Sequence, residues 1–338
     1  MNKKIEKIVL IVFVFFFFFF GKEIYFKRGI DQEKSFFIRE GEGVSAIAKN
    51  LEKEKLINND LFFQIYIFGS GNRPNLQAGH YLLNSAMTPY EISQKIINGE
   101  TIKNTITIPE GWNLRNIAWY FENNGFFQEE ELFELVGFLA LKTVDNEIPK
   151  EYNFSFLESK PHNISLEGFI FPDTYELEKD FTLNDFIEKS LINFNKKIFN
   201  KLKEEIENSQ YDTFEIITMA SLLEKEVSNF QDKQIVAGIL WKRLEDGMPL
   251  QVDATILYLT GKKNEILKSD KDIDSPYNTY QYKGLPLGPI CNPGFESVKA
   301  TLNPKKTDYW YYLSTPEGET IFSRTLEEHN IARNKYLK

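Results

Sequence analysis

Residues 216–228 read IITMASLLEKEVS, a stretch that is apolar for two helical turns and then presents two acids, Glu224 and Glu226. Upstream, Asp212 and Glu215 have the three-residue spacing of a capping box, which predicts that a helix begins there. At about 100° per residue the apolar side chains cover a wide arc, and the two acids fall on its opposite shoulders. The stretch therefore predicts a core helix that carries two partly buried carboxyl groups.

Two interpretations of these acids are open. A carboxyl group beside apolar neighbours favours its neutral form, and a carboxylic acid that keeps its proton near neutral pH is what a general acid at a glycosidic oxygen requires. The alternative is that both acids form salt bridges at the edge of a core helix. The helix alone does not decide between them.

Composition limits the classes of function. The chain has 338 residues, a net charge of -9 and 42% hydrophobic residues, which indicates about two globular domains and argues against nucleic acid as a partner. The single cysteine, Cys291, excludes an internal disulfide framework. His80, His162 and His329 have no metal-ligand spacing, so we expect no metal site and no cofactor.

The N-terminus carries the strongest compositional signal. Residues 8–20 are uninterruptedly apolar, which is short of the roughly 20 residues that span a bilayer and is also typical of a cleaved signal peptide. No small-residue cleavage site follows, and residues 24–26 extend the apolar length if Lys22 reaches back to the interface. We predict a single transmembrane anchor at residues 8–26; a cleaved signal is the alternative.

The basic residues give the orientation. Lys3, Lys4 and Lys7 favour a cytoplasmic N-terminus at residues 1–7, although Lys27 and Arg28 on the other side weaken this argument. The rest of the chain would then lie outside the cytoplasm, on the periplasmic side of the inner (plasma) membrane.

Residues 35–105 predict a small α+β subdomain. IREGEGVSAIAKNL at 38–51 resembles IPEGWNLRNIAWYF at 108–121, each with a strand, a Glu-Gly pair and a helix that opens near Ile-Ala. A strand at 80–83 and a helix that ends at Gly99 follow the first copy. The unit resembles a LysM-type module, which in other proteins binds the glycan of peptidoglycan. A simple spacer is the alternative.

Residues 106–338 predict a larger α+β domain. Helices are expected at about 112–122, 128–138 and 183–207, and a last helix from about Leu326. Residues 309–314 and 319–323 flank a Pro- and Gly-containing turn, which predicts a C-terminal β-hairpin. The fold class is therefore α+β: a transmembrane helix, a LysM-like subdomain, and a catalytic-sized domain with a hairpin.

The loop-rich stretch after the acidic helix is dense in Tyr, Pro and Gly, and Gln251, Asp253 and Asn278 lie in or near it. Aromatic rings with amide partners suit a sugar-binding groove, because the rings cover apolar sugar faces while the amides reach hydroxyls. Alternatively, the rings pack a hydrophobic corner.

In these blocks the sequence resembles the endolytic murein transglycosylases (YceG-like). The matching blocks are IPEGWNLRNIA (108–118), LEGFIFPDTYEL (166–177), ASLLEKEVSN (220–229), LQVDATILY (250–258), the stretch 275–304 and FSRTLEEHN (322–330). Departures are modest: Leu222-Leu223 stand where Ile-Val is usual, and Ala254 where Pro is common.

The resemblance implies a lytic transglycosylase that cleaves the MurNAc-GlcNAc bond of nascent peptidoglycan strands, leaves 1,6-anhydro-MurNAc ends and so terminates glycan elongation. It places the catalytic acid at Glu224 and implies penicillin-binding synthases as partners. As substrate-binding or supporting candidates we take Glu226, Gln251, Asp253, Asn278, Tyr280, Glu167 and Tyr175.

One acid suffices for such a reaction. Ordinary glycoside hydrolysis uses two carboxyl groups, whereas a lytic transglycosylase uses the C6 hydroxyl of the sugar itself, which is tethered at high effective concentration. Two alternatives remain: a non-catalytic peptidoglycan-binding or scaffold protein of the synthesis machinery, and a hydrolase that admits water.

Overall fold

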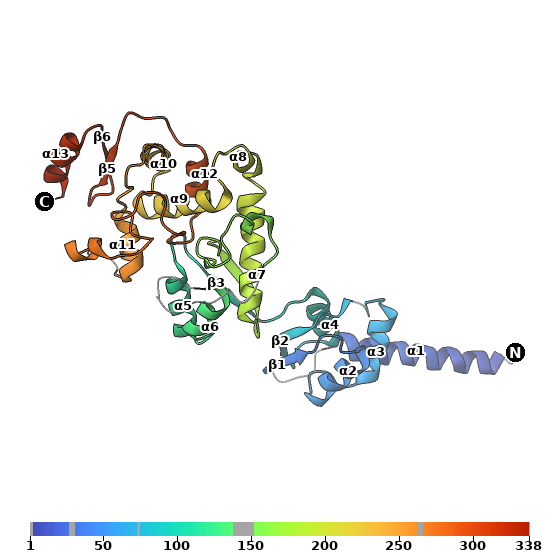
Figure 1. The fold of residues 1–338 in the computed structure, drawn as a ribbon. Coiled ribbons are helices and arrows are strands. Elements are labelled where there is room, and N and C mark those ends of the chain that lie inside the picture. The colour runs from blue at the N-terminus through green and yellow to red at the C-terminus, as the bar shows by residue number, and fades with distance from the viewer. Residues whose placement is uncertain (1–2, 27–30, 73–74, 138–151, 263–265, 338) are drawn as a thin grey trace. The chain divides into compact units, whose positions relative to one another are not determined.

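The computed structural model describes residues 3–26, 31–72, 75–137, 152–262 and 266–337. Lys27, Arg28 and the last residue of the helix predicted at 128–138 lie outside these ranges. The chain forms two compact units (Figure 1). Unit 1 comprises Met1–Thr105 with Glu176–Phe181, and unit 2 comprises Ile106–Tyr175 with Thr182–Lys338.

Unit 1 begins with a long apolar helix, α1 (Lys3–Tyr25). Within its segment Lys4–Tyr25, an 18-residue window has a mean hydropathy of 2.2, and only 6% of that window is buried. A helix of 22 residues is about 33 Å long, enough to cross the hydrocarbon core of a bilayer. Among the described residues, α1 is the one candidate membrane span.

The rest of unit 1 encloses its own hydrophobic core. An antiparallel strand pair, in which Phe36 lies opposite Tyr81, packs against three short helices, and the buried residues include Ile47, Phe63 and Ile92. The elements are β1 (Glu33–Ile38), α2 (Val44–Lys53), α3 (Asp60–Gly69), β2 (Gly79–Asn84) and α4 (Pro89–Asn98). Helix α4 ends at Gly99, as predicted, because this residue adopts the left-handed conformation (φ 65°).

A two-stranded ribbon joins segments that are distant in sequence. Strand β3 (Lys103–Thr107) pairs with β4 (Thr174–Glu178), and Glu176–Phe181 belong to unit 1. His80 and Asp180 form an ion pair across 3.5 Å within that unit when the histidine is protonated. Nothing in the local sequence predicts this return of the chain.

Unit 2 is mainly helical. Its elements are α5 (Leu114–Asn123), α6 (Glu129–Val136), η2 (Ser155–Leu157), α7 (Leu183–Phe194), η3 (Asn195–Phe199), α8 (Lys203–Glu207), α9 (Thr213–Glu226), α10 (Phe230–Glu245), α11 (Asp253–Thr260), η4 (Lys268–Asp272), α12 (Phe295–Leu302), β5 (Tyr311–Ser314), β6 (Thr320–Ser323) and α13 (Leu326–Tyr336). The single helix predicted at 183–207 is wrong in detail. A π-helical turn, in which the N–H of Asn200 donates to the carbonyl of Asn195, interrupts it.

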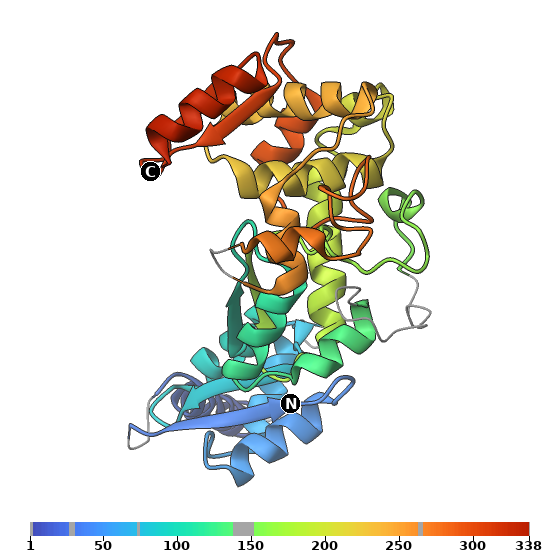
Figure 2. The same ribbon diagram turned by 60° about the vertical axis from the view of Figure 1, so that its left-hand side comes forward.

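The quoted helix is the centre of unit 2. Asp212 and Glu215 form the predicted capping box, and every residue from Ile216 to Leu223 is buried. Helices α10, α11 and α12 pack on α9. At the C-terminal end, β5 and β6 form the predicted hairpin and α13 packs on it, as the red elements of Figure 2 show.

One close approach fixes α10 against the chain that leaves α12. The N–H of Lys305 donates to the carbonyl of Gln234 across 2.9 Å, and the Trp241 indole donates to the Thr301 carbonyl. Gly238 makes this contact possible, because a Cβ atom there would lie 2.1 Å from the Lys305 carbonyl oxygen.

We therefore expect Gly238→Ala to destabilise unit 2. Alanine in a helix interior would otherwise stabilise by about 1 kcal/mol, whereas overpacking costs about 1–3 kcal/mol, so the sign of the change is the test. Urea unfolding followed by tryptophan fluorescence measures it. A variant more stable than the original chain would contradict the close approach.

Candidate active site

Glu224 lies near the C-terminal end of α9, with 10% of its side chain exposed. One carboxylate oxygen, Oε2, accepts three hydrogen bonds: from the Ser297 hydroxyl (2.6 Å), the Gly294 backbone N–H (3.0 Å) and the Lys233 ammonium (3.4 Å). Among the described residues none donates to Oε1. The carboxyl group is thus held at one oxygen, and the other oxygen has no hydrogen-bond donor among the described residues.

The segment that supplies Gly294 and Ser297 runs along α9. The Ile290 N–H donates to the Ser221 hydroxyl across 3.0 Å, and the Cys291 thiol donates to the Ser221 carbonyl. One helical turn later, Gly294 reaches Glu224 as the N-cap of α12. The bonds at Ser221 therefore fix where α12 begins and place its first turn on the acid.

A second carboxyl group, Glu110, stands beside Glu224. It comes from the Ile-Pro-Glu-Gly turn before α5 and lies so close to Gly294 that a Cβ atom there would be 2.0 Å from its Oε1. Burial and the negative charge of Glu224 raise the pKa of Glu110, while Lys233 opposes the rise. Sequence reasoning did not single out Glu110, although it lies in the repeated Glu-Gly motif.

A buried network holds the turn that carries Glu110. Asn292, fully buried, accepts from the Gly111 N–H and donates from its backbone and side chain to the Trp112 carbonyl. The Asn292 side chain also lies 3.5 Å from Glu167, which accepts from the Leu114 N–H and the Tyr258 hydroxyl. The network thereby links the turn that carries Glu110 to the segment that carries Gly294.

Three of the predicted substrate-binding or supporting residues are buried and hydrogen-bonded within the protein. Glu167 is completely buried at the N-terminus of α5, and burial raises the pKa of its carboxyl to about 8. Tyr175 is 2% exposed and donates to the Phe171 carbonyl. Asn278, completely buried, donates to the carbonyls of Lys271 and Ile273. In this structure these side chains are occupied within the protein interior.

Glu226 occupies a different environment from Glu224. Residues two positions apart on an α-helix are rotated by about 200° around its axis, so Glu224 and Glu226 point away from each other. Burial raises the pKa of Glu226 to about 7, and the nearby charge of Asp253 adds to the rise. Hydrogen bonds from Tyr312 and the Ala254 N–H, together with the charge of Arg243, partly offset it.

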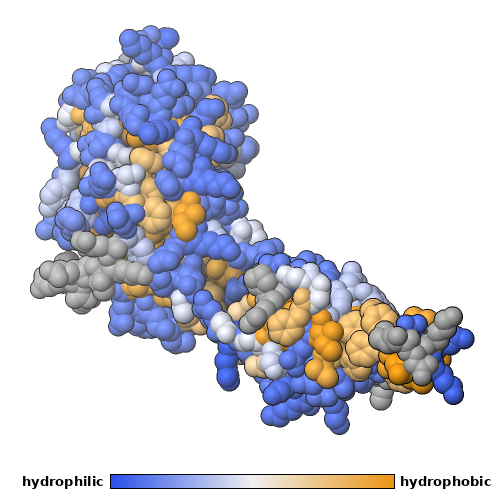
Figure 3. All heavy atoms as spheres, turned by 90° about the vertical axis from the view of Figure 1, so that its right-hand side faces the viewer, coloured by the Kyte–Doolittle hydropathy of each residue, from blue (hydrophilic) through white to orange (hydrophobic). Residues whose placement is uncertain are grey.

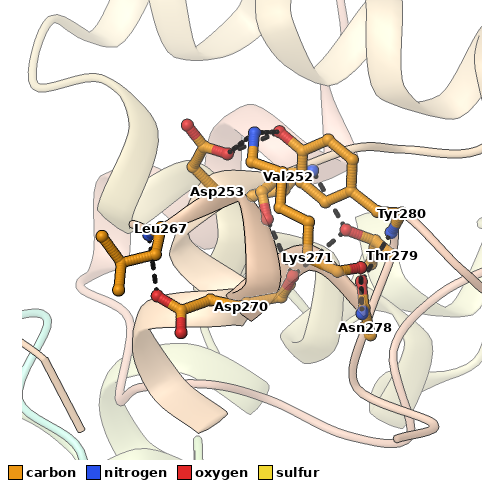
Figure 4. A network of polar contacts seen from close by, with 9 residues as sticks. Val252, Asp253, Leu267, Asp270, Lys271, Asn278, Thr279 and Tyr280 are labelled. Atoms are coloured by element: carbon orange, nitrogen blue, oxygen red, sulfur yellow. Dashed lines mark hydrogen bonds and ion pairs between the residues drawn. The ribbon is translucent and has the colours of Figure 1, made fainter. Parts of the chain in front are cut away.

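The remaining candidates gather on the Glu226 side of α9. Asp253 accepts a hydrogen bond from the Tyr280 hydroxyl and lies 3.0 Å from the Lys271 ammonium, as Figure 4 shows. The Lys271 ammonium also donates to the Tyr280 hydroxyl across 2.8 Å. Gln251 is exposed, adopts a left-handed φ of 54° and donates its N–H to the Thr279 carbonyl.

Two sets of candidates result. The Glu224 set comprises Glu110, Glu224, Lys233, Gly294 and Ser297; the Glu226 set comprises Glu226, Arg243, Asp253, Lys271, Tyr280 and Tyr312. Sequence reasoning found Glu224, Glu226, Asp253 and Tyr280 but missed Glu110, Lys233 and Ser297. A surface pocket of about 590 Å³ in unit 2 is lined by other residues, including Tyr211, Trp241 and Asn303. Within the described residues no group of three or more His, Cys, Asp or Glu side chains could hold a metal ion.

The fold and these sets define an α+β protein with an apolar N-terminal helix and a carboxyl-centred site. The model of the YceG-like family matches residues 36–335, and the chain belongs to this family. The family resemblance seen in the sequence is therefore confirmed.

Similar proteins carry a consistent name. An endolytic murein transglycosylase of Bacillus subtilis (strain 168) is 38% identical over 308 residues, 89% of this chain and 84% of that protein. One of Streptococcus pneumoniae serotype 2 (strain D39 / NCTC 7466) is 32% identical over 88% of this chain, which spans only 57% of that longer protein. The 2.6 Å crystal structure of a YceG-like protein from Listeria monocytogenes matches with a TM-score of 0.57 and 30% identity, over 90% of this chain and 100% of that one.

The buried acid Glu167 leads to a prediction about pH. Its pKa is about 8 in the folded chain and near 4.5 when exposed, so folding takes up a proton between these values. The contribution of Glu167 to stability is therefore greatest at low pH and falls as the pH rises toward about 8. Glu167→Gln, which cannot ionise, should flatten the fall, which is on the order of a few kcal/mol.

Urea unfolding at a series of pH values measures this effect. Glu317→Gln, in the exposed hairpin turn, serves as the control and should keep the original pH dependence. An equally steep dependence in Glu167→Gln would show that Glu167 is ionised in the folded chain.

Proposed function

We propose that this chain is an endolytic peptidoglycan lytic transglycosylase. Membership of the YceG-like family and the names of relatives at 38% and 32% identity support the proposal. The bond cleaved would be the MurNAc-GlcNAc glycosidic bond of nascent strands, and the product would carry a 1,6-anhydro-MurNAc end. Such cuts would end glycan elongation.

Glu224 is proposed as the catalytic acid, and its geometry carries this assignment. The three donors on Oε2 keep the carboxyl group from rotating, and Oε1 has no donor among the described residues. A general acid needs a fixed position and an oxygen that is not already engaged within the protein, because proton transfer requires hydrogen-bond reach to the glycosidic oxygen.

The reaction needs no water. Glu224 would give its proton to the leaving oxygen as the bond to C1 of MurNAc breaks. The resulting carboxylate would then take the proton of the C6 hydroxyl as O6 bonds to C1, which returns Glu224 to its acid form. Glu110 is a second carboxyl group near Glu224, and in its ionised form it would stabilise the positive charge at C1.

Glu226 is the rival for the role of acid. Its pKa of about 7 keeps it partly protonated at neutral pH, which suits proton donation. Tyr312 and the Ala254 N–H engage its carboxyl group, however, and we assign it with Asp253, Gln251 and Tyr280 to substrate binding or support.

The membrane and glycan-binding assignments extend the proposal. We place α1 as a single-pass anchor in the plasma membrane with both units outside the cytoplasm. The self-contained core of unit 1 supports an independent module at residues 35–105, LysM-like in our interpretation, with a spacer as the alternative. Penicillin-binding synthases remain predicted partners.

Glu224→Gln should abolish the release of anhydro-muropeptides from purified murein while the chain stays folded, because the amide keeps the shape and cannot donate the proton. Glu226→Gln, two residues along the same helix, is the matched control and should retain measurable release. Mass spectrometry of the digests detects the anhydro-muropeptides that each variant releases.

Full activity in Glu224→Gln would refute the assignment, and loss confined to Glu226→Gln would transfer it to Glu226. Binding without anhydro ends in the original chain would indicate a scaffold, and reducing ends a hydrolase.

Ser297→Ala should lower the turnover number about tenfold or more with little change in KM, because a hydrogen bond to a charged group contributes about 1.5–3 kcal/mol to holding it. Thr301→Ala is the matched control on the same helix, since its buried hydroxyl donates to the Ser297 carbonyl and not to the acid. Equal losses in both variants would mean that Ser297 only stabilises α12.

A further inference from the structure

Helix α3 is apolar on almost all sides, including the side that faces away from the core. Phe63 and Ile67 are buried in unit 1. Leu61, Ile65 and Phe68, spaced four and three residues apart, project from the other face and are 58%, 37% and 50% exposed. The polar side chains of this helix, Asp60 and Gln64, bond to each other across 3.1 Å.

The same face of α3 is joined to the candidate membrane span. The ring of Phe62 lies 6.3 Å from that of Phe16 and 5.8 Å from that of Phe20. On the α1 helix these rings are nine and five residues before Tyr25, or about 13 and 7 Å along the axis. The side chain of Phe62 therefore reaches well down the apolar part of α1.

Residues before and within α3 lie near the C-terminal end of α1. Asn58, just before α3, donates to Glu23 across 3.5 Å. Tyr66 contacts Tyr90, and Tyr90 contacts Tyr25, the last residue of α1. Helix α3 thus lies across α1, with Phe62 pointing along it toward the N-terminus.

This arrangement has the geometry of a helix at a membrane surface. A hydrocarbon core of about 30 Å takes up about 20 helical residues, nearly all of Lys4–Tyr25, so Phe16 and Phe20 lie inside it if α1 spans. An interfacial helix buries its apolar face about 5–10 Å deep, which agrees with the level of Phe62. Tyrosines gather where lipid meets water, as Tyr25, Tyr66 and Tyr90 do here.

We infer that α3 is a second membrane-binding element, which lies in the plane of the outer leaflet with Leu61, Phe62, Ile65 and Phe68 among the lipid acyl chains. Unit 1 then rests on the bilayer and is not held above it. Figure 3 shows orange, hydrophobic residues gathered on unit 1 on the side from which α1 extends. The inference rests on the proposed span of α1, and its test separates the two.

Single cysteine probes in the full chain test the placement. Ile65→Cys, Phe13→Cys and Glu52→Cys are labelled with an environment-sensitive fluorophore and reconstituted in phosphatidylethanolamine/phosphatidylglycerol vesicles that contain lipids with a nitroxide near the glycerol or deep in the acyl chain. Phe13 lies within α1, and Glu52 is exposed on α2. The natural Cys291 is buried, and the labelled original chain provides the blank.

We expect the shallow nitroxide to quench the Ile65 probe several-fold more than the Glu52 probe, and the deep nitroxide to quench the Phe13 probe most. An Ile65 probe quenched no more than the Glu52 probe, beside a quenched Phe13 probe, would overturn the inference and leave the anchor intact. Quenching of neither would refute the anchor and the inference together. A blue-shifted but unquenched Ile65 probe would mean that a second copy or another protein covers this face, which also overturns the inference.

Discussion

The burial of α9 is the constraint on which the candidate site depends. Because every side chain from Ile216 to Leu223 is buried, the helix can present functional groups only in its first and last turns. The Ser221 hydroxyl accepts a hydrogen bond from the backbone N–H of Ile290, which brings the segment before α12 onto the helix. In this position the Gly294 N–H and the Ser297 hydroxyl donate to Glu224.

The two acids differ because of what surrounds them. Glu224 has an ammonium group within 3.4 Å, a hydroxyl and a helix N-terminus, all of which interact favourably with negative charge. Glu226 is buried beside a tyrosine and near another acid, and this burial raises its pKa to about 7. One helix thereby creates two different carboxyl environments within a single turn.

Local signals predicted what local interactions build. The Asp212 cap, the Gly99 stop and the C-terminal hairpin depend on residues a few positions apart, and all three were readable in the sequence. The environment of Glu167 could not be predicted from the sequence, because its partners, Leu114 and Tyr258, are 53 and 91 residues away. Its sequence block marked it as a substrate-binding or supporting candidate, and the structure shows its carboxyl group at the N-terminus of a buried helix. Glu110 escaped notice because its neighbour Gly294 is distant in sequence.

The apolar character of α3 exceeds what the core of unit 1 uses. Two of its residues, Phe63 and Ile67, belong to that core. A helix that is apolar all round needs an apolar environment on every side, and unit 1 supplies it only on one. The opposite face must find its apolar environment elsewhere, and the contacts of Phe62 with α1 point to where the bilayer would supply it. The element that anchors the chain and the element that seats unit 1 are then parts of one continuous apolar surface.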